Sequence, residues 1–198
     1  MNRFDTLDRF FIQSWDLLFR AAQSRNDPMR TPMMATYDGK KCQLRTLVVR
    51  RVDKEARQLL FFTDIRSPKS IQLKAHPNTA ITFWHPTRKI QLRMQGSVSL
   101  EQDSEEARQH WDHLSIRGRE SYAAIPPPGK FSTMDTTGLP SNWSDELSKK
   151  ETDFAFSNFT LIKVSVEEID ALHLHSEGHQ RARFAWKKEE WEMKWLIP

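Results

Sequence analysis

The spacing of apolar residues along the chain predicts one helix followed mainly by short strands. Over residues 5–24 the apolar positions recur every three or four residues, which is the period of a helix with one buried face. These positions are Leu7, Phe11, Trp15, Leu18 and Ala22. The Asn26-Asp27-Pro28 segment is predicted to end this helix, because Pro cannot continue it and Asn and Asp favour turns.

The segment from residue 33 to residue 100 is predicted to form a run of strands. Met33–Tyr37 is the first, and an Asp38-Gly39 turn leads into a strand that carries residues 45–51. Strands are also expected at 58–63, 79–84 and 89–100, with a helix at 68–75. In the last strand, apolar residues 90, 92, 94 and 98 share one face and polar residues 91, 93, 95 and 97 share the other. This two-residue period is typical of a barrel strand.

The second half of the chain predicts peripheral helices, a long loop and further strands. Asp103 is expected to cap a helix that ends near Leu114, and a second helix is expected near 118–124. Residues 126–150 are rich in Pro, Ser, Thr and Gly and predict a surface loop with one short helix near Asp145. Strands are expected at 159–166, 182–186 and 191–196. This order predicts a mainly β fold, a closed or half-closed barrel with peripheral helices, in a single domain over residues 1–198.

Composition narrows the possible partners. The 30 basic and 26 acidic residues give a net charge of +4, and the two signs are interleaved, which favours a small anionic ligand over nucleic acid. The 7 Trp and 12 Phe residues are assigned to core and interface packing rather than to base stacking. Cys42 is the only cysteine, and no apolar run approaches the roughly 20 residues of a membrane span. With no signal-peptide pattern at the start, a cytoplasmic protein without a membrane partner is expected.

Residues 67–69 carry the clearest chemical signal. Ser67 is suited to cap a helix, Pro68 to occupy its first position, and Lys69 places a cation in its first turn. Cations destabilise that end of a helix, whereas the free N–H groups there attract anions. A bound phosphate would account for Lys69.

These residues form part of a longer pattern. Arg45 is followed five positions later by Arg50, then come Phe61-Phe62-Thr63-Asp64 and Ser67-x-Lys69, and Gln91 stands five residues before Gly96. The order resembles the FMN-binding half of the pyridoxamine 5′-phosphate oxidase-like proteins. The resemblance implies an FMN-binding split β-barrel and a homodimer with the cofactor at its interface. It assigns cofactor contacts to Arg45, Thr46, Leu47, Val48, Arg50, Phe62, Thr63, Ser67, Lys69, Gln91 and Arg183.

The same resemblance suggests where a substrate would bind. Arg117 and Ser121 have the spacing of the family's substrate-phosphate ligands, and His113 stands where the family has a tyrosine. His179 and Arg181 occupy the positions of a family arginine and histidine in exchanged order, and Pro68 replaces a family arginine. No catalytic residue is assigned. Arg45, Arg50 and Arg117 also fit a simpler interpretation, in which they are solvated surface charges.

Three functions fit this sequence. The leading interpretation is an FMN-dependent oxidoreductase that acts on a small, phosphorylated or otherwise anionic substrate. A flavin- or deazaflavin-dependent reductase on the same barrel is the second, and a non-enzymatic flavin or haem carrier or sensor is the third. In the third, the histidines at 173, 175 and 179 would bind the ligand. They lack supporting cysteines and carboxylates, apart from Glu177, so no metal is expected.

Overall fold

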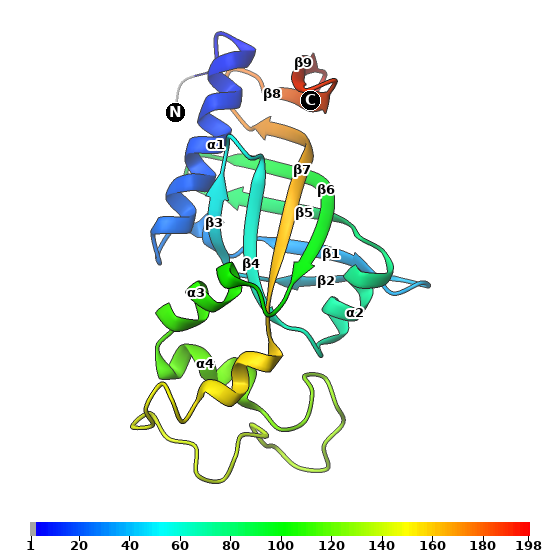
Figure 1. The fold of residues 1–198 in the computed structure, drawn as a ribbon. Helices are drawn as coiled ribbons and strands as arrows, with labels where there is room; N and C mark the ends of the chain where they lie inside the picture. Colours follow the sequence, from blue (N-terminus) through cyan, green and yellow to red (C-terminus); the bar gives the residue numbers. More distant parts are fainter. Residues whose placement is uncertain (1–2) are drawn as a thin grey trace.

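A computed structural model of the protein describes residues 3–198. The predicted first helix is present as α1 (Leu7–Gln23), which the hydroxyl of Thr6 caps by accepting from the Arg9 N–H at 3.2 Å. A short 3-10 helix, η1 (Pro28–Arg30), follows. Figure 1 shows α1 lying along one side of a strongly curved sheet, with the C-terminal strands beside the N-terminal half of the helix.

The nine strands of residues 3–198 form one antiparallel sheet. Seven of them follow the order β2-β1-β5-β6-β7-β4-β3, and β8 and β9 extend the sheet from the second half of β7. The mainly β fold predicted from the sequence is confirmed. The bounds are β1 (Met33–Tyr37), β2 (Cys42–Thr46), β3 (Val49–Asp53), β4 (Gln58–Asp64), β5 (Asn78–His85), β6 (Ile90–Glu101), β7 (Phe159–His173), β8 (Gln180–Lys187) and β9 (Glu190–Leu196).

A close approach of two backbones fixes the path of β6. The register between β6 and β7 shifts between Gln95 and Gly96, so that β7 has one extra residue at this point. A Cβ atom added at Gly96 would collide with the Ser165 carbonyl. Only glycine therefore allows β6 to stay paired with β7 on both sides of this bulge.

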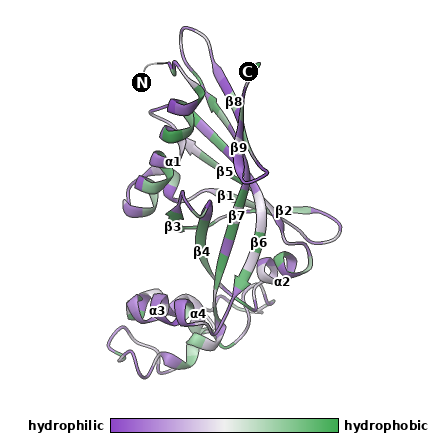
Figure 2. Ribbon diagram, turned by 45° about the horizontal axis from the view of Figure 1, so that its top comes forward, coloured by the Kyte–Doolittle hydropathy of each residue, from purple (hydrophilic) through white to green (hydrophobic). Residues whose placement is uncertain are grey.

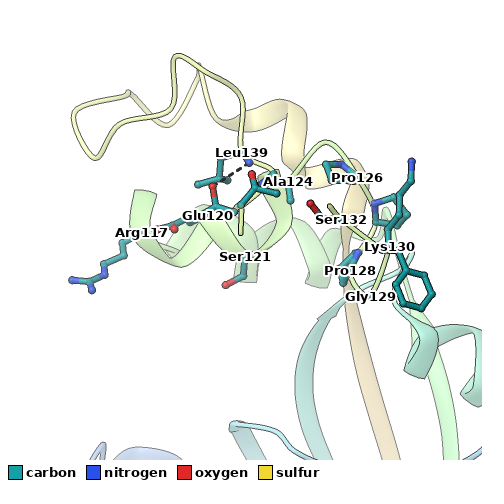
Figure 3. Close-up of a pocket in the computed structure, with 15 residues that line it drawn as sticks. Arg117, Glu120, Ser121, Ala124, Pro126, Pro128, Gly129, Lys130, Ser132 and Leu139 are labelled. Atoms are coloured by element: carbon teal, nitrogen blue, oxygen red, sulfur yellow. Dashed lines mark hydrogen bonds between the residues drawn. The ribbon is translucent and has the colours of Figure 1, made fainter. Parts of the chain in front are cut away.

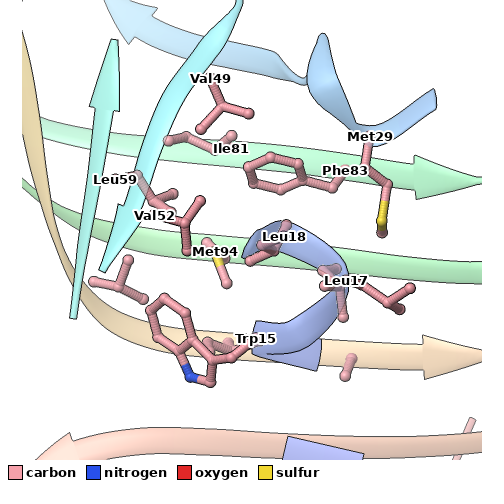
Figure 4. Close-up of a cluster of buried hydrophobic side chains, with 14 of the residues drawn as sticks. Trp15, Leu17, Leu18, Met29, Val49, Val52, Leu59, Ile81, Phe83 and Met94 are labelled. Atoms are coloured by element: carbon pink, nitrogen blue, oxygen red, sulfur yellow. The ribbon is translucent and has the colours of Figure 1, made fainter. Parts of the chain in front are cut away.

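The core lies between α1 and the concave face of the sheet. Trp15 and Leu18 of α1 are at most 1% exposed and face apolar side chains of the strands, among them Val52 and Phe83 (Figure 4). Green apolar segments accordingly concentrate on the strands that α1 covers (Figure 2). The helical period of α1 and the two-residue period of the strands thus meet in one buried layer.

A second, smaller core lies at the opposite end of the long strands. It is built by α3 (Glu105–His113), α4 (Ile116–Ala123) and the 3-10 helix η2 (Asp153–Asn158). Trp111 and Phe159 are fully buried there, with their ring centroids 5.5 Å apart. The long loop between α4 and η2 hangs below this group of helices (Figure 1).

Several predicted boundaries are corrected by the structure. The single strand predicted to carry residues 45–51 is two strands, β2 and β3, because the chain leaves one sheet edge at Leu47 and joins the other at Val49. The cap of α3 is Ser104, whose hydroxyl accepts from the Ala107 N–H at 3.0 Å, and not Asp103, which has a left-handed backbone. The region around Asp145 forms turns only.

The strand expected to end at residue 166 continues to His173, because its second half gains β8 as a new partner. Within residues 3–198, no helix is long and apolar enough to cross a membrane.

Candidate functional site

The beginning of α2 (Pro68–Ala75) is held firmly against the end of β4. The Ser67 N–H donates to the Asp64 carbonyl at 3.1 Å, and the Ser70 hydroxyl donates to the same oxygen at 2.7 Å. The Ser67 side chain does not cap the helix, although it is 1% exposed. The first N–H groups of α2 therefore have no side-chain cap from Ser67, which is the condition for anion binding at a helix start.

Lys69 turns back over this helix start. Its Nζ lies 3.0 Å from Thr63 Oγ1 and 3.3 Å from Ser67 Oγ. Burial lowers the pKa of Lys69, and the nearby charge of Arg45 lowers it further, whereas Asp64 opposes the shift. Within residues 3–198 no carboxylate lies within ion-pair distance of this ammonium group, so its charge is left for a ligand.

Arg45 reaches the same place from β2. Its guanidinium donates to the hydroxyl of Thr36 on β1, and to Gln72 Oε1 on α2 at 3.2 Å. Both partners are neutral, so they orient the guanidinium without neutralising it. Burial lowers the pKa of Arg45, as expected for a cation with no carboxylate beside it.

A cavity of about 350 Å³ joins this cationic corner to the small core. Eight residues of the sequence-predicted site line it, which are Thr46, Leu47, Val48, Arg50, Phe62, Thr63, Lys69 and Ser121. The Arg50 guanidinium carbon lies 5.1 Å from the centroid of the Phe62 ring and makes no ion pair within the described residues. Burial lowers the pKa of Arg50. The fold thus gathers most of the predicted cofactor residues around one cavity.

Sequence reasoning missed four residues that line this cavity, which are Thr31, Asp64, Tyr122 and Pro128. Asp64 is 4% exposed and pairs with Arg66, whose Nη2 lies 2.7 Å from Asp64 Oδ2. The same guanidinium donates to the carbonyls of Ala124 at 2.9 Å and Ile125 at 3.2 Å. The Asp64–Arg66 pair therefore ties the loop after α4 to the turn before α2, and no sequence motif announces this contact.

The loop after α4 closes on itself at a narrow neck. The Ile125 N–H donates to the Gly138 carbonyl at 2.8 Å, and Gly138 has a φ of 69°. An added Cβ there would lie 2.9 Å from Pro126 Cγ. A second cavity of about 810 Å³ lies between this loop and α4, and it shares Ser121 and Pro128 with the first. Figure 3 shows that the Arg117 side chain extends away from the loop.

Other predicted residues lie on a different face of the sheet. Arg93, Asp170 and Arg183 stand opposite one another on β6, β7 and β8, and Gln91 and Arg181 follow two residues away on the same outer face. Arg45 pairs in register with Met34, which is buried on the inner face. Within one chain, Gln91, Arg181 and Arg183 therefore do not join the cavity.

Two predicted substrate residues also lie outside the cavity. His113 is exposed at the end of α3, where its Nδ1 lies 2.6 Å from the Gln109 carbonyl oxygen. His179 lies beside His175 and Trp84 in a separate surface hollow. His173 is 2% exposed and packs between Phe4 and His175. No group of three or more His, Cys, Asp or Glu residues that could hold a metal occurs within residues 3–198.

The chain is similar to a known FMN-binding domain. Residues 12–102 match the model of the family described as "Pyridoxamine 5'-phosphate oxidase, FMN-binding domain". Over 66 residues the chain is 39% identical to a pyridoxine/pyridoxamine 5′-phosphate oxidase of Azotobacter vinelandii. This alignment covers 33% of this chain and 30% of the relative. A Xylella fastidiosa relative of the same name is 32% identical over 93 residues, 44% of this chain and 43% of its own. These alignments span less than half of each relative.

Solved structures extend the similarity over almost the whole chain. A pyridoxamine 5′-phosphate oxidase-related, FMN-binding protein of Nostoc punctiforme is 25% identical, with a TM-score of 0.72 and 96% of both chains covered. PhzG of Burkholderia lata, in complex with tetrahydrophenazine-1-carboxylic acid, is 15% identical, with a TM-score of 0.73 over 100% of this chain and 98% of its own, and shows the fold alone. The resemblance to the pyridoxamine 5′-phosphate oxidase-like split barrels is confirmed, and the cofactor of the matching domain is FMN.

Proposed function

We propose that this protein is an FMN-dependent oxidoreductase that binds the FMN phosphate at the start of α2. The observation that carries the proposal is that Lys69 and Arg45 lie next to a helix start that no side chain caps, and that neither cation makes an ion pair with a carboxylate of residues 3–198. A phosphate with two negative charges matches this set, because charge-assisted hydrogen bonds to phosphate are strong in a partly buried site. Thr63 and Ser67 add hydroxyl groups beside Lys69.

The rest of the cavity would hold the remainder of the cofactor. Leu47 and Val48 form an apolar wall, and Phe62 offers its ring with Arg50 stacked over it. When bound, FMN supplies hydride transfer, and the protein supplies orientation and polarity around it. Arg50 places a positive charge next to the cavity, where it favours electron-rich groups of a ligand.

The cofactor site is completed by a second copy of the chain. Gln91 and Arg183 lie on the outer sheet face, together with the exposed apolar residues Met33, Leu44 and Trp84. A homodimer that covers this face would bury the apolar residues and place Gln91 and Arg183 next to the partner's cavity. A two-fold axis would create two equivalent sites of this kind.

Turnover of pyridoxamine 5′-phosphate is expected to be weak, because not all residues that the resemblance assigns to substrate binding lie at the cavity. His113 is turned to the Gln109 carbonyl, and Arg117 lines the larger cavity under the loop but not the one proposed to hold the cofactor. Steady-state oxidase assays on FMN-loaded protein test this expectation. A kcat/KM on the order of 10⁴ M⁻¹s⁻¹ or more would identify pyridoxamine 5′-phosphate as an effective substrate and contradict it.

The cofactor proposal itself is tested by titration of the protein with FMN, FAD and riboflavin. FMN is expected to bind most tightly, because riboflavin lacks the phosphate and the chain has no glycine-rich dinucleotide motif. Tighter binding of FAD than of FMN, or equal binding of riboflavin and FMN, would contradict a site built around a terminal phosphate.

A further inference from the structure

We propose that Arg66 is a positioning residue, which holds the loop after α4 (residues 124–138) as a wall of the cofactor cavity and thereby sets the rate at which the cofactor leaves. Arg66 does not itself line that cavity. The proposal rests on the function proposed above, and it gives a task to a residue to which the resemblance assigns none.

The guanidinium of Arg66 binds two parts of the chain at once. Its Nε and Nη2 donate to the two carboxylate oxygens of Asp64, at 3.1 and 2.7 Å. Nη2 also donates to the Ala124 carbonyl at 2.9 Å, and Nη1 donates to the Ile125 carbonyl at 3.2 Å. Because Asp64 is buried and the arginine fork matches its two oxygens, this pair is stronger than an exposed ion pair. The end of β4 therefore holds the backbone of two successive loop residues.

These two carbonyls belong to the narrow neck of the loop. The carbonyl of Ile125 accepts from Arg66, and its N–H donates to the Gly138 carbonyl at 2.8 Å. The Ile125 side chain is 70% exposed, so its packing contributes little to the position of the neck. Hydrogen bonds of the backbone, with Arg66 as the link to the sheet, therefore hold the neck in place.

From the neck the chain leads directly to the cavity. The Pro126-Pro127-Pro128 segment follows, and its last residue lines the cavity together with Lys69. Because the φ angle of proline is fixed, this segment transmits the position of the neck to the cavity wall with little freedom. Gly129 then passes the first turn of α2, where an added Cβ atom would lie 3.3 Å from Pro68 Cγ. Figure 3 shows Pro128 and Gly129 on the side of the loop toward the sheet.

One short segment of the chain thus contacts both the cofactor site and the loop. Ser67 and Lys69 belong to the proposed phosphate site, whereas Arg66 and Pro68 contact the loop. A phosphate bound at the start of α2 and a closed loop stabilise the same backbone, so each should favour the other. Because Arg66 acts through the loop, its loss should affect FMN and riboflavin alike, unlike the loss of a direct phosphate contact.

Amide hydrogen exchange of Ile125 in the flavin-free protein tests the anchor without the cofactor. The Ile125 N–H should exchange about tenfold faster in Arg66→Ala than in wild type, as for the loss of a hydrogen bond to a charged group. Gly138→Ala breaks the neck independently, because an added Cβ atom would lie 2.9 Å from Pro126 Cγ at a φ of 69°. Gly39→Ala is the matched control, since Gly39 has a φ of 92° in the remote turn between β1 and β2, and it should leave the exchange of Ile125 unchanged.

Release of the flavin is the second readout, followed by flavin fluorescence after dilution of the loaded protein. Arg66→Ala and Gly138→Ala should each release FMN and riboflavin about tenfold faster than wild type. Arg66→Lys keeps a positive charge beside Asp64 but lacks the planar fork, so it should also release both flavins faster, and it decides the matter if Arg66→Ala does not fold. Arg51→Ala, which loses only a pair with Glu106 on the far side of the small core, is the control and should match wild type.

Three results would separate the possible outcomes. Unchanged exchange of Ile125 in the Arg66 variants, or unchanged release of both flavins, would overturn the proposal. Faster release of FMN but not of riboflavin would also overturn it, because Arg66 would then be a direct ligand of the phosphate. If wild type bound no FMN while Ile125 exchanged faster in the Arg66 variants, the anchor of the loop would stand and the cofactor proposal would fail.

Discussion

Two groups of basic residues in this protein have opposite surroundings. Arg50 and Lys69 line the cavity and Arg45 lies near Lys69 at its edge; the three make no ion pair within residues 3–198 and have pKa values lowered by burial. On the outer sheet face, Arg181 and Arg183 pair with Asp170 and Glu168, and hydrogen bonds to these carboxylates raise their pKa values.

The difference separates charges kept for a ligand from charges used within the protein. A buried cation without a partner lowers the stability of the folded protein. Such a cation is retained when the free energy of ligand binding offsets this loss. A paired cation on a sheet surface needs no such explanation. For Arg183 this implies that a flavin contact across a dimer interface would have to compete with Glu168.

The largest effect is expected when the outer face itself is disrupted. Leu44 is 68% exposed on β2, and Leu44→Glu places a charge in the proposed dimer interface. The variant should sediment as a monomer at micromolar concentration. It should bind FMN about 100-fold more weakly, because contacts from Gln91 and Arg183 of the second copy are lost together, at about 1.5 kcal/mol each. Phe19→Glu on α1 is the control and should leave both properties unchanged. A flavin-loaded wild-type monomer would contradict the dimer.

Removal of one unpaired cation should be the next largest effect. Lys69→Ala is expected to weaken FMN binding by roughly 1.5–3 kcal/mol, the free energy of a charge-assisted hydrogen bond. Lys74→Ala, in the last turn of the same helix, should not alter FMN affinity. Riboflavin affinity should barely change in either variant. Equal losses for FMN and riboflavin would show that Lys69 acts on the fold or on ring binding.

Arg45 offers a direct comparison with a paired arginine. Arg45→Ala is expected to weaken FMN binding by about 1.5 kcal/mol, at the lower end of the range, because Thr36 and Gln72 can still bond to each other. Arg51, six residues away, pairs with Glu106 at 2.9 Å, so Arg51→Ala should leave FMN affinity unchanged. Isothermal titration calorimetry of both variants with FMN tests this expectation. An equal loss of FMN affinity in Arg45→Ala and Arg51→Ala would show that ion pairing does not distinguish the cations that bind the cofactor.

The smallest effect is expected on the paired face. Burial raises the pKa of Asp170, but hydrogen bonds from Arg181 and Arg93 outweigh it, so the pKa is lower in the folded protein. The carboxylate therefore stabilises the fold above its unfolded pKa of about 3.9, and this contribution is lost as the pH falls through the folded value. Asp170→Asn should cost about 1 kcal/mol at pH 7 in denaturant unfolding. The difference from wild type should shrink below about pH 4, and a gap independent of pH would contradict this assignment.

Local pattern was sufficient for most of the fold. The bounds of β1 and α2 were predicted to the residue, because a two-residue period and a Ser-Pro helix start are signals within a few neighbouring residues. The break at Leu47–Val48 was missed, since apolar residues continue through it and only the partner strands reveal the change of sheet edge.

In the candidate site, too, local contacts could be predicted from the sequence and long-range contacts could not. Lys69 and Thr63 lie six residues apart, and their contact follows from a strand, a turn and a helix in succession. Tyr122 and Arg66 depend on the packing of α4 and its loop against β4, which no spacing in the sequence encodes. The face on which Gln91 lies was predictable from alternation, but its separation from Arg45 required the strand order.

The narrow neck between Ile125 and Gly138 also bears on how this protein can diversify. The backbone bond at the neck and the Asp64–Arg66 anchor hold the two ends of residues 127–137, and of this segment only Pro128 lines the smaller cavity beside the sheet and α2. Insertions, deletions and substitutions in most of this segment can therefore accumulate without disturbing the core or the cofactor phosphate site. Because the segment forms one wall of the larger cavity, descendants of this chain can acquire new substrate ranges by changing the loop alone.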